Sequence, residues 1–189
     1  IAAVRVFSER KVDELILIDI GASSGGIGID TDFISEIAKH CFMPLTVGGG
    51  ITSVREAVSL ISRGADKILI GKCLFENPSE VLSIIERIGS QAVVGSIDVV
   101  RYDGELRTVF DAGNRSPTPL CQVLENVAEL GVGEICLTSV DKEGTLSGVE
   151  AELLHVVNGW GGAVPLVLNG GVSGSVDLLR AFDAGFSGV

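Results

Sequence analysis

Metal-binding and redox-active residues are scarce in this chain. Its 189 residues include only two histidines and four cysteines, and no two cysteines have the CxxC spacing of a zinc site. The cysteines lie apart in apolar stretches, as is typical of reduced thiols in the cytoplasm: Cys41, Cys73, Cys121 and Cys136. We therefore expect a cytoplasmic protein with neither a metal nor a cofactor.

Positive charge and long apolar runs are also in short supply. Fourteen basic residues stand against 25 acidic ones, which gives a net charge of -11. Such a chain repels the phosphates of nucleic acids and of anionic membranes. No apolar run approaches the roughly 20 residues of a membrane span. The composition thus excludes nucleic acid and membrane as partners, whereas 46% hydrophobic residues suffice for one buried core.

Short runs rich in Val, Ile and Leu alternate with amphipathic stretches. The runs predict strands over 14–20, 44–48, 67–71, 92–98, 134–139 and 165–169, with another beginning near 187. Because the runs are apolar on both faces, they indicate a buried parallel sheet. Helices are expected to begin at the capping position Ser53, at Asn77 and Thr118, each followed by a proline, and at Ser175.

Two segments read as loops between these elements. Residues 21–28 (GASSGGIG) predict a mobile loop. Residues 99–117 predict a small hairpin whose turn lies at Asp103 and Gly104, because Asp-Gly favours the tight turn between antiparallel strands.

Three pairs of similar segments recur at a constant spacing. Residues 11–19 resemble 131–139 at an offset of 120, and 44–53 resemble 165–174 at an offset of 121. Residues 63–69 resemble 184–189, again at 121. A duplicated unit of four strands and four helices predicts a (β/α)8 TIM barrel built from two half-barrel repeats. The alternative is an open doubly wound sheet.

The repeat predicts that this single domain, residues 1–189, is a partial barrel. The strand at 92–98 opens the second repeat, and its counterpart would precede residue 1. We therefore expect the first strand to be missing and the last to be truncated.

Active sites of such barrels lie at the carboxyl ends of the strands, which is where two aspartates occur. Asp98 ends an apolar strand, where burial raises a carboxyl pKa and suits it to general acid–base catalysis. A helix cap or an anchoring hydrogen bond is the alternative for Asp98. For Asp19, which ends an earlier strand, structural anchoring is the favoured interpretation.

Glycines follow the two strands that the repeat relates. Gly48–Gly50 and Gly170–Gly171 let backbone N–H groups approach an anion closely, so the pair predicts a substrate with a phosphate at each end. Tight packing is the alternative.

At the opposite strand ends, charged residues would ring the bottom of a barrel or lie solvated: Glu14, Lys67 and Glu134.

Seven segments of the chain together resemble one known family. They are DELILIDI (13–20), PLTVGGGI (44–51), GADKILI (64–70), ENPS (76–79), GSQAVV with SID (89–98), GEICLTSVDKEGT (133–145) and NGG (169–171). The family is that of the cyclase subunits of imidazole glycerol phosphate synthase (HisF), of histidine biosynthesis. The resemblance keeps the order of the motifs over essentially the whole chain.

The resemblance implies an activity and a partner. In the family, a glutaminase subunit docks at the bottom of the barrel, and its ammonia passes up the barrel to a ribulosyl-formimino nucleotide with two phosphates. This lyase reaction yields imidazole glycerol phosphate and an aminoimidazole carboxamide ribonucleotide. The implied assembly is a heterodimer with the glutaminase.

The resemblance also implies site residues. Asp98 matches the second of two catalytic aspartates, the first lying on the absent first strand. The ammonia gate is matched by Glu14, Lys67 and Glu134, and the glutaminase-facing positions by Asp66 and Gln91. The substrate and phosphate positions are Gly50, Gly71 and Lys72 for one phosphate, and Thr138, Glu143, Gly144, Asn169, Gly170 and Gly171 for the other.

Four positions depart from the family pattern. Gly71 and Lys72 replace an Asn-Thr pair, Glu143 replaces an Asp, and Asn169 replaces a Ser. The opening residues 1–16 and CFMPL (41–45) instead look like a paralogue group of surface-polysaccharide clusters. There the barrel is thought to supply ammonia to a sugar amidotransferase. A third alternative is the related sugar-phosphate isomerase of the same pathway, to which the gate residues are less similar.

Overall fold

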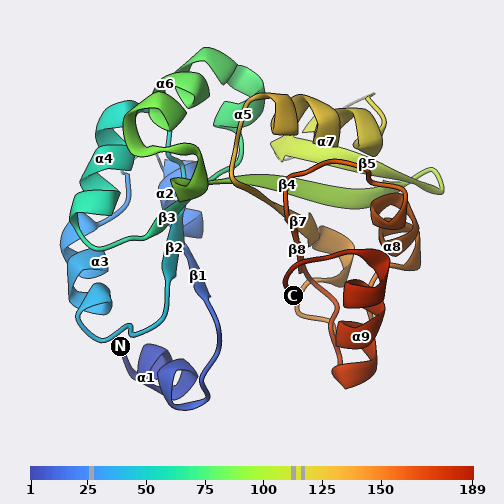
Figure 1. Cartoon of the computed structure of the whole chain (residues 1–189), viewed down its shortest axis with the longest axis horizontal. Coiled ribbons are helices and arrows are strands. Elements are labelled where there is room, and N and C mark those ends of the chain that lie inside the picture. The colour runs from blue at the N-terminus through green and yellow to red at the C-terminus, as the bar shows by residue number, and fades with distance from the viewer. Residues whose placement is uncertain (26–27, 112–113, 116–117) are drawn as a thin grey trace. The chain divides into compact units, whose positions relative to one another are not determined.

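The computed structural model describes residues 1–25, 28–111, 114–115 and 118–189. The chain divides into two compact units, Ile1–Val94 and Gly95–Val189. Strands alternate with helices along both units (Figure 1). Parallel strands joined through helices are the βα units of a TIM-type barrel, so the predicted α/β class is confirmed.

The first unit contains three short parallel strands and the helices between them. β1 (Leu15–Ile18) pairs with β2 (Leu45–Gly48), and β2 pairs with β3 (Lys67–Ile70). The described helices are α1 (Ala2–Glu9), α2 (Ile20–Gly25), α3 (Thr31–Ala38), α4 (Val54–Ser62), α5 (Cys73–Glu76) and α6 (Pro78–Ile88), followed by the 3-10 turn η1 (Ser90–Ala92). β2 is buried on both faces, as the parallel-sheet prediction required.

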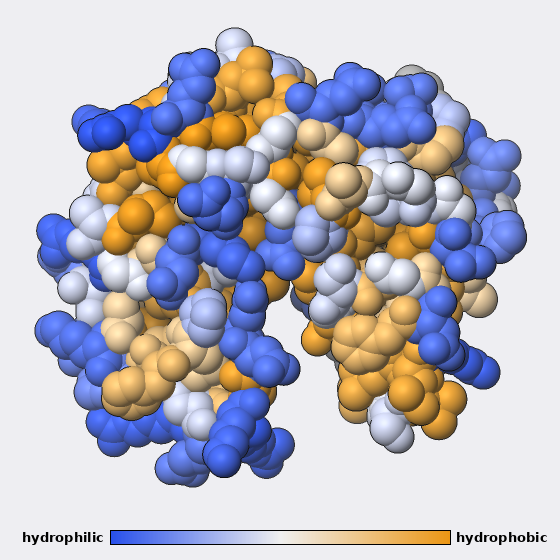
Figure 2. Space-filling view, in the orientation of Figure 1, coloured by the Kyte–Doolittle hydropathy of each residue, from blue (hydrophilic) through white to orange (hydrophobic). Residues whose placement is uncertain are grey.

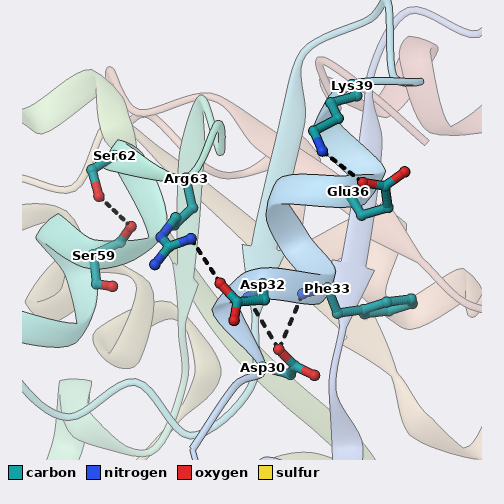
Figure 3. Close-up of polar contacts among 8 residues, drawn as sticks. All are labelled: Asp30, Asp32, Phe33, Glu36, Lys39, Ser59, Ser62 and Arg63. Atoms are coloured by element: carbon teal, nitrogen blue, oxygen red, sulfur yellow. Dashed lines mark hydrogen bonds and ion pairs between the residues drawn. The ribbon is translucent and has the colours of Figure 1, made fainter.

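Side-chain caps begin several helices of this unit. Ser53 accepts from the Glu56 N–H at the start of α4, and Asn77 caps α6 with Pro78 in its first position, as predicted. The Asp30 carboxylate caps α3 by accepting from two backbone N–H groups of its first turn (Figure 3). Arg63, past the end of α4, lies 2.7 Å from Asp32 and so ties α4 to α3.

The second unit combines a hairpin with a parallel pair. β4 (Val93–Tyr102), within which the two units meet in sequence, is antiparallel to β5 (Glu105–Asp111), and β7 (Glu134–Ser139) is parallel to β8 (Leu166–Asn169). The strand β7 pairs with β4 as well as with β8. The remaining elements are β6 (Asn114–Arg115), α7 (Leu120–Glu129), the 3-10 turn η2 (Val140–Lys142), α8 (Ala151–Asn158) and α9 (Ser175–Ala184).

Each helix buries apolar side chains on its inner face, and α9 also exposes apolar side chains on its outer face. Ala181 is buried on α9, whereas its outer face shows apolar side chains to solvent (Figure 2): Val176, Leu178, Leu179 and Phe182. Among the described residues, no helix combines the length and the apolar character that crossing a bilayer requires.

The six complete predicted strands and the hairpin turn are confirmed. Tyr102 pairs with Glu105 across the turn, where Asp103 and Gly104 have φ values of +49° and +81°. Such φ values are those that this turn demands. Residues 112–113 and 116–117 of the predicted hairpin segment lie outside the described residues.

Two local predictions are wrong. The segment 21–28 was expected to be a loop, but α2 occupies Ile20–Gly25, because the Asp19 carboxylate accepts from the N–H groups of Gly21 and Ala22 and so begins a helix. Residues 26–27 of that segment lie outside the described residues. Pro119, rather than Thr118, occupies the N-cap position of α7, which begins at Leu120.

The two parallel pairs have matching registers. Leu15 pairs with Leu45 and Ile18 with Gly48 in the first unit. Ile135 pairs with Leu166 and Thr138 with Asn169 in the second. Each pair also begins with the same backbone bond, from Leu15 N to Pro44 O at 3.0 Å and from Ile135 N to Pro165 O at 2.9 Å.

Candidate functional site

Asp98 is joined to β7 and β8 by a chain of hydrogen bonds. The Thr138 hydroxyl donates to the Asp98 carboxylate, and it accepts from Asn169 Nδ2 at 3.4 Å. Thr138, near the end of β7, is buried, whereas part of Asp98 remains exposed. Asp98 does not end its strand as predicted, because β4 runs on to Tyr102 in the hairpin, whereas Thr138 and Asn169 lie near the ends of β7 and β8. The three residues thus form one polar row that reaches solvent.

Burial raises the pKa of the Asp98 carboxyl, and the negative charge of Glu143 raises it further. The hydrogen bond from Thr138 acts against these two effects by favouring the carboxylate. A carboxyl with a raised pKa and a path to solvent can both take up and release a proton during a reaction. The geometry therefore suits Asp98 for acid–base chemistry.

Cys136, on the same strand as Thr138, has no comparable reactivity. Burial raises the pKa of its thiol to about 12. Thiolate is the nucleophilic form of cysteine, so Cys136 serves as a small core residue, as the composition predicted.

Glycines after β7 and β8 come together beside this row. Gly148 N donates to Gly171 O at 2.8 Å. A Cβ on Gly170 would lie 2.6 Å from Ser139 O, and Gly144, Gly170 and Gly171 all have positive φ values, which glycine adopts readily. Among the described residues, the N–H groups of Gly144 and Gly171 have no hydrogen-bond partner, so both can donate to an anion.

The glycines after β2 repeat this local geometry in the first unit. A Cβ on Gly49 would lie 2.5 Å from Asp19 O, and the N–H of Gly50 has no partner within the described part of the chain. Gly49 and Gly50 line a pocket of about 250 Å³ with Arg55 of α4. Asp19 itself is used in capping α2, which matches its predicted structural role.

Gly71 and Lys72 lie between β3 and α5, with Lys72 at the N-cap position of α5. Gly71 O accepts from Leu74 N at 2.9 Å. Lys72 Nζ lies 3.3 Å from Glu76 Oε1, and half of the Lys72 side chain is exposed. Lys72 thus brings a solvent-accessible positive charge to the end of β3.

The predicted gate residues lie at the amino-terminal ends of strands. Lys67 Nζ contacts both Glu14 carboxylate oxygens, at 2.9 and 3.1 Å, so the structure brings these two residues together. Glu134 is the half-buried first residue of β7, in the other unit. Glu14 and Lys67, at the starts of their strands, therefore form an ion pair instead of being solvated separately.

The two predicted interface residues are exposed. Asp66 Oδ2 accepts from Leu45 N at 2.8 Å, so its carboxylate also fastens the start of β2. Gln91 lies on η1 with an exposed side chain. Both are accessible to a partner.

Arg101 organises contacts that the sequence did not reveal. Its N–H donates to Asp141 Oδ2 at 2.6 Å, and its guanidinium contacts Glu150 at 2.7 Å and Glu152 at 2.8 Å. Arg101 also donates to Gly104 O at the hairpin turn. The hairpin is thereby held to η2 and α8, through pairs that no local pattern marks because they are 40 or more residues apart.

Comparison with known proteins places these features in a family. Residues 1–189 match the family model described as histidine biosynthesis protein. A putative imidazole glycerol phosphate synthase subunit hisF2 from Campylobacter jejuni is 41% identical over 187 residues, which cover 97% of this chain and 73% of the relative. Subunits named imidazole glycerol phosphate synthase subunit HisF are 36% identical in Dictyoglomus thermophilum and 37% in Dictyoglomus turgidum, over 98% of this chain and 74% of each relative.

Proposed function

The chain belongs to the histidine biosynthesis protein family, and on that premise we propose that it acts as the cyclase subunit of imidazole glycerol phosphate synthase. In this function it uses ammonia to convert a ribulosyl-formimino nucleotide into imidazole glycerol phosphate and an aminoimidazole carboxamide ribonucleotide. The named relatives, 36–41% identical over nearly the whole chain, support this assignment.

The observation that carries the mechanism is the hydrogen-bonded row of Asp98, Thr138 and Asn169. Cyclisation requires proton transfers, and a positioned carboxyl contributes about 10²–10⁴-fold to such steps. Asp98 exchanges the proton, while Thr138 orients its carboxylate and Glu143 keeps its pKa raised. Asn169 in turn orients Thr138, which gives this departure from the family pattern a role.

The unpaired glycine N–H groups support binding of the two substrate phosphates. Gly144 and Gly171 would donate to one phosphate, with Gly170 allowing the close approach. Gly50 would donate to the other, where Lys72 supplies charge beside Gly71. Backbone N–H donors are well suited to phosphate oxygens.

The matching registers of β1–β2 and β7–β8 support a (β/α)8 barrel built from two repeats. The paired strands recur at the offsets of 120 and 121 residues that the sequence repeat has. In this proposal the chain is a partial barrel lacking the first strand, on which the partner of Asp98 would lie.

A glutaminase is the proposed partner of this subunit, in the cytoplasm. Asp66 and Gln91 offer exposed polar contacts to it, and the ion pair of Lys67 with Glu14 would control the entry of ammonia, together with Glu134. Asp66→Lys would then weaken the association.

One observation favours a second function, ammonia supply to a sugar amidotransferase. Gly71 and Lys72 replace the side chains that the family places beside a phosphate, and the Campylobacter relative is itself named hisF2. In that case the barrel conducts ammonia without cyclising the nucleotide. Among the described residues, no contact favours the related sugar-phosphate isomerase.

The test measures turnover of the ribulosyl nucleotide by the full-length protein with free ammonium, which bypasses the glutaminase. We expect the wild type to turn over and Asp98→Asn to lose about 10²–10⁴-fold in rate while remaining folded. Equal rates would make Asp98 structural. Absence of turnover in the wild type would favour the ammonia-supplying function instead.

A further inference from the structure

Asp177 is a buried carboxylate on the first turn of α9. Its exposed fraction is 6%, and in the part of the chain that the structure describes it is the only charged residue that is buried. Burying a charge is unfavourable unless hydrogen bonds compensate for the lost water. The contacts of Asp177 therefore indicate what its burial accomplishes.

The carboxylate bonds two separate segments of the second unit. Its Oδ2 accepts from Ser173 N at 2.9 Å and from Ser173 Oγ at 2.6 Å, in the segment that follows β8. It also accepts from the backbone N–H of Val149, in the segment that follows β7. Arg180, one turn further along α9, adds an attractive charge.

These two segments carry the proposed anion donors. Gly144 precedes Val149 in the first segment, and Gly171 precedes Ser173 in the second. The segments touch directly through the bond from Gly148 N to Gly171 O, at 2.8 Å. Asp177 thus lies behind the junction of the two strand-end segments whose glycines have unpaired N–H groups.

A comparison within the chain separates this role from simple helix capping. Glu56, at the equivalent place on α4, accepts from Thr52 N at 2.9 Å, from Thr52 Oγ1 at 3.2 Å and from Ser53 Oγ at 3.0 Å. All of these donors belong to the segment that leads into α4. Asp177 makes the corresponding bonds to Ser173 and adds the bond to Val149, which a helix cap does not need.

We propose that Asp177 is a positioning residue of the phosphate site formed by Gly144 and Gly171. It does not touch the phosphate; its carboxylate holds the segments after β7 and β8 at the separation that one anion can bridge. Binding sites need their donors placed within about 0.5 Å, and a rigid link between two loops provides this. The inference rests on the proposed function, because it deepens the account of that phosphate site.

The test uses Asp177→Asn in the full-length protein, with inorganic phosphate as the probe. Asparagine is nearly the same size but has one oxygen, so its NH₂ group would face an N–H or O–H donor of one segment. Phosphate affinity is measured by titration while the amide resonances of Gly144 and Gly171 are followed. We expect a loss of about tenfold or more, the scale of one hydrogen bond to a charged group.

Controls separate a positioning role from general damage. Glu56→Gln is the matched variant and should leave the titration at Gly144 and Gly171 unchanged. Ser173→Ala is the substitute test if Asp177→Asn fails to fold. It removes the bond from Ser173 Oγ to Asp177 at an exposed residue, and it should also weaken phosphate binding. With ammonium, KM for the nucleotide should rise more than kcat falls.

Two results would overturn the inference, and they differ. Unchanged phosphate affinity in a folded Asp177→Asn, or in Ser173→Ala if Asp177→Asn fails to fold, would reduce Asp177 to a helix cap while leaving the proposed function intact. Absence of phosphate binding at Gly144 and Gly171 in the wild type would remove the site itself, and with it this part of the proposed function.

Discussion

Gly148 and Gly171 are in backbone contact. Gly148 N donates to Gly171 O at 2.8 Å, and Gly148 O lies 2.5 Å from the point at which a Cβ on Gly171 would stand. Both residues have positive φ, +89° and +86°. The segments that follow β7 and β8 therefore meet at a distance that only glycine permits.

Replacing Gly171 by alanine should be strongly destabilising. The new Cβ would overlap Gly148 O, and the positive φ adds strain of its own. We expect the free energy of unfolding to fall by about 2–4 kcal/mol, from the strain of about 1 kcal/mol and the overlap of about 1–3 kcal/mol. Denaturant unfolding measures the change.

Gly144→Ala is the matched control for this change. Gly144 has φ +68°, but nothing lies within 4 Å of its Cβ position. Gly144→Ala should lower the free energy of unfolding only by the backbone strain that it introduces, about 1 kcal/mol. Equal losses for the two variants would contradict the overlap at Gly171.

The pKa of Asp98 should move in opposite directions when its two neighbours are changed. Glu143→Gln removes a negative charge and should lower the pKa, whereas Thr138→Val removes a stabilising hydrogen bond and should raise it. NMR titration of the Asp98 carboxyl checks both shifts. If Asp98 acts as the ionised base, the acid limb of the rate profile should follow them.

Asp98 should also limit stability at neutral pH. The folded protein holds the Asp98 proton more tightly than the unfolded chain, whose pKa is about 3.9. Stability is therefore lost as pH rises from that value through the folded pKa. Asp98→Asn should be more stable than the wild type at pH 7, and the difference should shrink at acid pH. A constant difference would contradict this origin.

Thr108→Val should stabilise the second unit. Thr108 lies on β5 with no exposed surface, and its hydroxyl finds no partner among the described residues. Removing an unpaired buried hydroxyl should raise the free energy of unfolding by about 1 kcal/mol. Thr108→Ser keeps the hydroxyl and loses a methyl group, so it should instead lower stability by about 1 kcal/mol. Thermal unfolding distinguishes the two outcomes.

Lys67→Ala should uncouple glutamine use from ammonia use. The change removes the ion pair with Glu14 at the start of β3, so ammonia released by the glutaminase should be lost to solvent. The glutamine-dependent rate should fall by about tenfold relative to the ammonium-dependent rate, equivalent to about 1.4 kcal/mol in one barrier. Lys39→Ala, which breaks an exposed pair with Glu36, is the control. An unchanged ratio in Lys67→Ala would argue against a gate.

Local patterns predicted the strands, the hairpin turn and most helix starts. The caps Ser53 and Asn77 can be recognised in the sequence because a capping residue bonds to the first turn of the helix that directly follows it. The same reasoning failed at α2, where Asp19 caps a helix in a glycine- and serine-rich segment that alone favours a loop. Propensity is a weak guide when a side chain at the end of a strand supplies the cap.

The candidate site likewise has features that the sequence predicted and features that it did not. The sequence singled out Asp98 because it follows an apolar run in a predicted barrel, although it did not show that β4 continues past Asp98 to Tyr102. The bonds that Asp177 makes to Val149 and Arg101 makes to Glu150 were not readable, because they join residues that only the fold brings together. Such long-range polar contacts carry no periodic signal in the sequence.

The shared registers of β1–β2 and β7–β8 leave the unfolded chain with interchangeable pairing partners. β1 could pair with β8 in the same register that it has with β2. Both β2 and β8 follow a proline and carry apolar residues at alternating positions. Loop closure favours the nearer partner by only about 0.6 kcal/mol for each doubling of the loop. Exchange of these strands within one chain, or between two chains at high concentration, is thus a built-in route to misassembly and domain swapping.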